Sequence, residues 1–270
     1  LVGIIAIVNI NMNYLTSYAK ERDPYGVVDN DNPINIGYDF LMESDEPLKI
    51  RKSLLGKNVI ISNMVGLYGD LREEGSNYTY TLKDFLNGVE EFNINIDGKD
   101  ELLRIVPAPE MVYDSDFIGI NYDGNFETEY DDRHYGGSAV KNADKSVVAK
   151  LSFEYKGASI EMSAKTTNAT GKVTARLYSK DESDEYVLIP GTGQTIITKS
   201  SRNLNNFKRK IYICRAVNEN INKRHDVFIP KNNVSYIDFF KIYNPLENSD
   251  SSKYIEALYE RYNLRKAEYI

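Results

Sequence analysis

Residues 146–243 constrain the fold most, because short runs of β-branched and aromatic residues follow one another there with no helical periodicity between them. Each run ends in Gly, Asn, Pro or an acidic turn. The runs are residues 147–155, 158–164, 172–179, 186–189, 195–198, 210–215, 225–229 and 235–243. Strand following strand without an intervening helix predicts antiparallel sheets packed as a sandwich, and it disfavours an α/β sheet.

An N-terminal extension or arm is predicted over residues 1–46. Residues 1–10 are apolar and β-branched, which predicts a buried strand, and residues 13–22 predict a short helix. The apolar run is far shorter than the ~20 residues that span a bilayer. It also lacks the basic start and the small-residue cleavage site of a signal peptide. Membrane insertion is therefore not expected.

A small mixed α+β unit is predicted over residues 47–109. Its predicted strands alternate or are β-branched, and its one predicted helix, residues 82–92, has apolar residues at helical spacing. Asp97-Gly98 stands between two apolar runs, as in a β-hairpin. Pro107-Ala108-Pro109 predicts a stiff, extended linker to the sandwich, which is assigned to residues 110–244.

The last 26 residues, 245–270, predict a closing helix. One stripe of the helix is apolar and rich in tyrosine, and it consists of Tyr254, Ile255, Leu258, Tyr259 and Tyr262. Such a stripe must cover another surface. Two alternatives stay open, namely packing on the body of the same chain and docking onto a neighbouring chain as an assembly helix.

The composition excludes some classes of partner. The net charge is −7, so no broad basic surface is available for the phosphates of nucleic acid or for an anionic membrane. Cys214 is the single cysteine, so no disulfide can form within the chain. The chain has 21 Tyr and no Trp, and because tyrosine is enriched at interfaces as well as in sandwiches, this excess favours a binding or assembly protein.

The usual catalytic patterns are missing from the sequence. It has no Gly-x-Ser-x-Gly elbow, no phosphate-binding Gly-Lys-Ser/Thr loop, no His-Glu-x-x-His and no cysteine pair for zinc. Only His134 and His225 could serve a histidine-dependent reaction, and His225, inside an alternating strand, is predicted to be a structural, hydrogen-bonding residue. We therefore predict no catalytic residue, no metal site and no cofactor. Acid pairs such as Glu127 with Glu129 leave a hydrolase as a remote alternative.

The most polar and aromatic loop leads into the sandwich at residues 127–137. Loops on a rigid scaffold often carry function. Tyr130, His134 and Tyr135 from this loop, together with Tyr178 from a later strand, are the candidate residues for stacking on a glycan and hydrogen bonding to it.

Several segments of the sandwich follow an order known from one family. First comes a strand that ends in an aromatic residue, an acidic residue and a glycine. A strand that follows a glycine comes next. A strand that opens with His and a strand that opens with Ile-Asp come last. These segments are residues 151–157, 158–162, 171–178, 225–229 and 236–242. The order resembles the galactose-binding-domain-like jelly roll of carbohydrate-binding modules, accessory domains of SGNH-type esterases, and bacteriophage tail and baseplate proteins. The chain departs from the pattern in its lack of Trp and in the long polar stretch 179–210.

Two hypotheses for function follow. In the first, the chain is a non-enzymatic structural and adhesion component of a multi-chain assembly, a phage tail or baseplate protein of the virion whose jelly roll serves host attachment. Its partners are then other copies or subunits and a host-surface glycan. In the second, it is a carbohydrate-binding accessory region of a larger exported bacterial glycan-active enzyme, outside the cell or at its surface.

Overall fold

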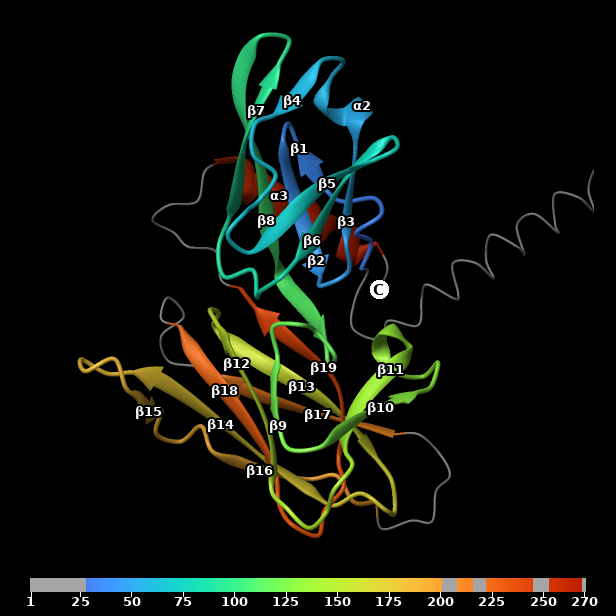
Figure 1. Cartoon of the computed structure of the whole chain (residues 1–270), viewed down its shortest axis with the longest axis vertical. Helices are drawn as coiled ribbons and strands as arrows, with labels where there is room; N and C mark the ends of the chain where they lie inside the picture. Colours follow the sequence, from blue (N-terminus) through green and yellow to red (C-terminus); the bar gives the residue numbers. More distant parts are fainter. Residues whose placement is uncertain (1–27, 201–207, 216–221, 245–252, 269–270) are drawn as a thin grey trace, which may run out of the picture.

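The computed structural model describes residues 28–200, 208–215 (as backbone), 222–244 and 253–268, and these residues form two stacked β units and a helix (Figure 1). The strand predicted at 1–10 and the helix predicted at 13–22 lie outside the described residues. Within the described residues, no helix is long and apolar enough to cross a membrane.

The lower unit in Figure 1 is a sandwich of two antiparallel sheets, which we name after their central strands. The β19 sheet has the order β10 (Phe126–Tyr130), β11 (Ser138–Asn142), β19 (Tyr236–Tyr243), β13 (Ser159–Thr166) and β17 (Lys208–Arg215). The β18 sheet has the order β9 (Asn121–Asp123), β12 (Ala149–Tyr155), β18 (Lys223–Ile229) and β14 (Lys172–Lys180), and both β15 (Tyr186–Leu188) and β16 (Gln194–Ile197) pair with β14. All these pairs are antiparallel.

The chain passes from sheet to sheet as a jelly roll does. Strands β11, β12, β13 and β14 belong alternately to the β19 and the β18 sheet, and so do β17, β18 and β19. Consecutive strands of these two runs thereby lie in opposite sheets, and the hydrogen-bonded partners are distant in sequence, as when β12 pairs with β18 and β13 with β19. The predicted fold class, an antiparallel jelly-roll sandwich with a C-terminal helix, is confirmed.

The upper unit is joined to the sandwich by one long strand, β8 (Lys99–Asp114). The end of β8 pairs with β19, whereas its start pairs with β7 (Glu90–Ile96) and its middle with β2 (Asp39–Ser44). The remaining elements are β1 (Asn35–Ile36), β4 (Val59–Ile61), the one-turn helix α2 (Lys52–Leu55), and a second sheet of β3 (Leu48–Arg51), β6 (Asn77–Leu82) and β5 (Gly69–Glu74). The boundary predicted at residue 109 therefore falls inside a strand.

The predicted linker Pro107-Ala108-Pro109 is extended as expected, but it is part of β8 rather than a free connection. Ala108 is fully buried. The hairpin predicted at Asp97-Gly98 is confirmed, because β7 and β8 pair across this turn. Both turn residues have a positive φ, 50° for Asp97 and 85° for Gly98, as a tight hairpin between twisted strands requires.

The helix predicted over residues 82–92 is wrong. Leu82 ends strand β6, residues 83–89 form no regular element, and β7 begins at Glu90. Phe85 leaves this loop and stacks on Phe153 of β12, with ring centroids 4.7 Å apart and planes at 9°. The apolar spacing that resembles a helix thus comes from side chains that reach into a core shared by both units.

Helix α3 (Lys253–Ala267) lies against β1, β2 and β8 of the upper unit. The helix buries three side chains, Leu258, Tyr259 and Tyr262, against Leu41 of β2 and Val106 of β8. Ile255 packs at the edge of this cluster, and Tyr254 stays 45% exposed. Of the two alternatives for the helix, packing on the chain's own body is the one that the structure shows, so most of the stripe is not available to a neighbouring chain.

The Tyr259 hydroxyl donates a buried hydrogen bond to the carbonyl oxygen of Pro107, at 2.8 Å. We expect Tyr259→Phe to lower the free energy of unfolding by about 1 kcal/mol, because the buried carbonyl loses a donor. Urea unfolding would measure the change. Tyr254→Phe, in the same helix at an exposed position, is the matched control and should change stability by less than about 0.5 kcal/mol. Equal effects of the two substitutions would argue against a stabilising role for this hydrogen bond.

Candidate functional site

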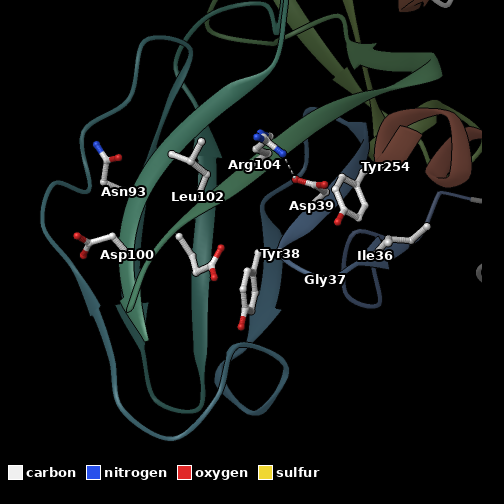
Figure 2. Close-up of a pocket in the computed structure, with 10 residues that line it drawn as sticks. Ile36, Gly37, Tyr38, Asp39, Asn93, Asp100, Leu102, Arg104 and Tyr254 are labelled. Carbon is white, nitrogen blue, oxygen red and sulfur yellow. Dashed lines mark hydrogen bonds and ion pairs between the residues drawn. The ribbon is translucent and has the colours of Figure 1, made fainter. Parts of the chain in front are cut away.

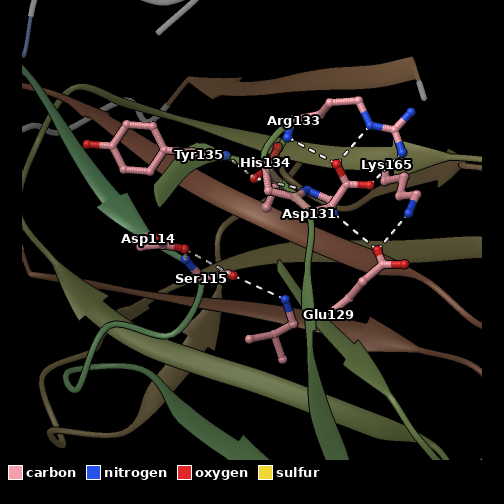
Figure 3. A network of polar contacts seen from close by, with 10 residues as sticks. Asp114, Ser115, Glu129, Asp131, Arg133, His134, Tyr135 and Lys165 are labelled. Carbon is pink, nitrogen blue, oxygen red and sulfur yellow. Dashed lines mark hydrogen bonds and ion pairs between the residues drawn. The ribbon is translucent and has the colours of Figure 1, made fainter. Parts of the chain in front are cut away.

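Three of the four predicted glycan-face residues, Tyr130, His134 and Tyr135, lie at the end of β10 and in the loop after it, and Figure 3 shows His134 and Tyr135 there. Tyr130 ends β10 and is 83% exposed. Tyr135 opens the short 3-10 helix η1 (Tyr135–Gly137), which connects β10 to β11, and His134 precedes it. The loop thus gathers these residues as the sequence indicated, but only Tyr130 is open to solvent.

His134 is buried between two carboxylates. Its side chain is fully shielded from solvent, with Nε2 3.1 Å from Glu129 Oε2 and Nδ1 3.4 Å from Asp238 Oδ1. Lys165 of β13 donates to the same oxygen of Glu129 at 2.6 Å. Burial acts to raise the pKa of Glu129, but the hydrogen bonds from Lys165 and His134 outweigh it and lower that pKa. His134 therefore ties β10 to β19 and does not present itself to a ligand.

Tyr135 is also engaged within the fold. Its ring lies 5.5 Å from the ring of Phe239, and its backbone N–H donates to Asp238 Oδ1 at 2.8 Å. Nearby, the guanidinium of Arg133 holds the pKa of Asp131 well below its usual range. The network of Figure 3 is consequently a structural one that fixes the loop on the sheet.

Tyr178 lies in the other sheet, on β14, so the structure does not bring it together with Tyr130, His134 and Tyr135. Its ring is half-buried on the outer face of the β18 sheet. The guanidinium of Arg224, directly opposite on β18, stacks over it at 4.7 Å from the centroid, and over Tyr186 of β15 at 4.3 Å. One arginine thus holds two tyrosine rings in place.

Further along the same face, Asp226 holds two cations. Its carboxylate is 1% exposed, and it accepts a hydrogen bond from Arg224 Nε at 3.1 Å and lies 3.4 Å from Lys150 Nζ. Phe228 follows, flanked by Lys150 at 5.8 Å and by Arg176 at 5.4 Å from its ring centroid. We call these side chains the β18 face: Lys150, Arg176, Tyr178, Tyr186, Arg224, Asp226 and Phe228.

Most of the β18 face was missed from the sequence, although a signal exists. Arg224, Asp226 and Phe228 alternate along one strand, so they share one side, and His225 between them points to the core. His225 is fully buried against Phe153, and burial lowers its pKa to about 3, so it is neutral. The expected hydrogen bonding of His225 is wrong, since neither ring nitrogen has a hydrogen-bond partner among the residues that the structure describes.

A separate cavity of about 640 Å³ opens on the upper unit (Figure 2). It lies between the β1–β2 turn, the β7–β8 hairpin and the start of α3. Its lining residues are Ile36, Gly37, Tyr38, Asp39, Asn93, Asp100, Glu101, Leu102, Arg104 and Tyr254. Among the described residues, no group of three or more His, Cys, Asp or Glu side chains could hold a metal ion.

No protein-family model matches the sequence, and no curated protein is significantly similar to it. The solved structures that the chain resembles include a family two carbohydrate esterase from Cellvibrio japonicus, at 8% identity and a TM-score of 0.35 over 50% of this chain and 34% of that one. They also include the carbohydrate-binding module TmCBM61 in complex with beta-1,4-galactotriose, at 15% identity and a TM-score of 0.33 over 48% and 92%. A third is tailspike protein 4 of bacteriophage CBA120, at 10% identity and a TM-score of 0.31 over 45% and 18%.

These are the kinds of protein that the sequence resembles. The chain spans about a third of the esterase and less than a fifth of the tailspike protein. A function for this chain therefore has to be sought in its own side chains.

Proposed function

We propose that the protein is a non-enzymatic, glycan-binding component of a multi-chain assembly, a bacteriophage tail or baseplate, and that the β18 face contacts the glycan. The observation that carries the proposal is the stacking of Arg224 over both Tyr178 and Tyr186 on an outer sheet face. Two rings and a planar cation are thereby fixed before a ligand arrives, which lowers the entropy cost of binding.

The chemistry of the β18 face suits a sugar. Aromatic rings such as Tyr178 and Phe228 offer apolar surface to the C–H face of a pyranose, while Arg176 and Lys150 offer donors to its hydroxyl groups. The buried carboxylate of Asp226 is neutralised by neighbouring cations. It orients those cations and is too deeply buried to contact a substrate, which supports binding rather than catalysis.

The upper unit supports a role in an assembly. It shares strand β8 and one apolar core with the sandwich, so the sandwich that carries the β18 face packs firmly on the upper unit. In a virion, the upper unit would contact other subunits while the sandwich faces the host surface. The alternative, an accessory region of an exported glycan-active enzyme, uses the same β18 face with a catalytic domain in place of the other subunits.

Glycan binding is tested by Tyr178→Ala. We expect this change to weaken the affinity for the glycan identified in an array screen about 10-fold, because it removes a stacking ring. The matched control is Tyr130→Ala, which removes a more exposed ring beside the other sheet and should leave the affinity unchanged. Loss of binding in the control but not in Tyr178→Ala would mean that the glycan binds beside the β19 sheet and not at the β18 face.

The assembly role is tested by the mass of the protein isolated from its native source at low concentration. A large, defined multimer would support it. A monomer of 30.8 kDa would exclude it, and a longer polypeptide with a catalytic domain would favour the accessory-region alternative.

A further inference from the structure

The cavity on the upper unit continues the sheet face that helix α3 covers. Asp39 and Leu41 alternate along β2 and lie beside Arg104 and Val106 of β8, so all four belong to one side of the sheet. Helix α3 covers Leu41 and Val106. Beyond the start of the helix, at Tyr254, the same face is open and forms the cavity.

A buried acid lines this cavity with one oxygen unused. Asp39 is only 4% exposed, and its Oδ1 accepts a hydrogen bond from Arg104 Nη1 at 3.2 Å. Its Oδ2 accepts none from any residue that the structure describes, and this oxygen is not fully shielded from the cavity. Burial raises the pKa of Asp39 although Arg104 acts to lower it. A ligand that enters the cavity can therefore donate a hydrogen bond to this oxygen.

Other polar groups around the cavity are similarly available. Within the described part of the chain, the side chains of Tyr38, Asn93, Glu101 and Tyr254 make no hydrogen bond to another residue. Figure 2 shows the two tyrosine rings on the side of β1, β2 and α3, across from Asn93 and Leu102. Donors and acceptors interleaved with rings and an apolar patch match a hydroxylated ring, whose edge is polar and whose faces carry C–H groups.

The charge of the cavity limits the classes of ligand that can bind there. Asp39, Asp100 and Glu101 contribute carboxylates. Arg104 is the one cation among the described residues of the lining, and it already pairs with Asp39 and, at 2.9 Å, with Glu91. Acidic sugars and phosphates would meet net repulsion there, and an ammonium group would meet attraction. The β18 face is the opposite in character, because three cations surround its one buried acid.

We propose that this cavity is a second sugar-binding site, which accepts one or two neutral or amino-bearing sugar rings and rejects acidic ones. Its volume of about 640 Å³ lies within the range of roughly 300–1,000 Å³ that is usual for small-molecule sites. It is separate from the β18 face and does not depend on the function proposed for it.

The test is isothermal titration calorimetry of the full chain with glucosamine, glucose and glucuronate as probes. Glucosamine should bind most tightly, glucose less tightly, and glucuronate should show no saturable binding. Glu101→Lys changes an exposed side chain without hydrogen-bond partners and should lower the glucosamine affinity at least 10-fold. Tyr254→Ala should lower the affinity for both glucosamine and glucose.

Two controls separate this site from other causes. Leu264→Ala alters an exposed residue of the same helix outside the cavity and should leave all affinities unchanged. In Tyr178→Ala, which loses a ring of the β18 face, the preference for glucosamine over glucuronate should persist, because the cavity is intact. The proposal is overturned if no probe binds saturably, if glucuronate binds as well as glucosamine, or if Glu101→Lys and Tyr254→Ala bind as the unsubstituted chain does.

Discussion

Replacing Glu90 with alanine should lower the free energy of unfolding by about 3–5 kcal/mol, since several buried hydrogen-bond donors lose their acceptor. Glu90 begins β7 and is 5% exposed. Its carboxylate accepts backbone N–H groups from Leu67 at 2.9 Å, Tyr68 at 2.6 Å and Gly69 at 3.2 Å, and the Tyr80 hydroxyl lies at 3.3 Å. One side chain thereby organises the whole turn before β5.

The expected loss is large because the donors have no substitute. Each buried N–H group left without an acceptor costs about 1–3 kcal/mol. The turn also closes tightly on the carboxylate, since a Cβ atom on Gly66 would lie 2.6 Å from Glu90. A water molecule could replace the carboxylate only if the turn moved away from β7.

Urea unfolding of Glu90→Ala, Glu90→Gln and Glu91→Ala would test this interpretation. Glu90→Gln keeps one side-chain oxygen, so its loss of unfolding free energy should fall between those of Glu90→Ala and Glu91→Ala. Glu91 is the matched control, because it is the next residue along, exposed, and paired only with Arg104 at 2.9 Å. Its removal should cost less than about 1 kcal/mol. Similar losses in Glu90→Ala and Glu91→Ala would contradict the anchoring role.

The sandwich was predictable because its strands are amphipathic in a simple way. Along β12, Leu151 and Phe153 are buried while the residues on either side of each are not, and this alternation is visible in the sequence. The helix predicted at residues 82–92 was wrong for a related reason. Local spacing cannot show that Phe85 belongs to a core formed with Phe153, which is 68 residues away in the sequence.

The site was predictable only in part. Tyr178 lies on the outer face that strand alternation implies, and the same alternation could have added Arg224 and Phe228. His134 looked like an exposed loop residue, but Asp238, more than 100 residues later, lies beside it and helps to bury it. Pairings of that kind depend on how the sheets come together, and no local pattern in the sequence reports them.

The cavity on the upper unit has no counterpart in the sequence pattern. Asp39, Arg104 and Tyr254 come from three distant segments, and none of them belongs to a motif. Their proximity follows from the parallel pairing of β2 with β8 and from the position of α3. A binding site formed in this way becomes visible only once the topology is known.

The protein should be less stable at pH 8.5 than at pH 6.5, by about 2–3 kcal/mol, because buried carboxyl groups resist ionisation. Burial raises the pKa of Asp45 to about 7, and burial together with the charges of Asp116 and Asp45 raises that of Asp114 to about 8. Asp45 Oδ2 accepts the Asp114 N–H at 3.1 Å, and Asp114 Oδ1 accepts the Ser115 N–H at 2.5 Å.

The direction of this pH dependence follows from how many protons the folded and the unfolded state bind. In the unfolded chain both aspartates titrate near pH 3.9, as free side chains do. Between about pH 4 and pH 8 the folded state therefore holds more protons than the unfolded state, and stability falls as the pH rises. His225 acts the other way, because its pKa is lowered to about 3 in the fold, but its contribution is complete above about pH 6.5. Above that pH the contribution of His225 no longer offsets that of the two aspartates, and the decline should become visible.

Asp114→Asn is the decisive variant, because the amide has a similar shape and cannot ionise. The difference in stability between Asp114→Asn and the unsubstituted chain should grow, in favour of the variant, by about 2 kcal/mol between pH 6.5 and pH 8.5. Urea unfolding at a series of pH values would measure this difference. Asp123→Asn, an exposed aspartate of β9, is the control and should leave the slope unchanged. Parallel stability curves for Asp114→Asn and the unsubstituted chain would mean that Asp114 is ionised in the fold, and the low stability expected at high pH would then need another cause.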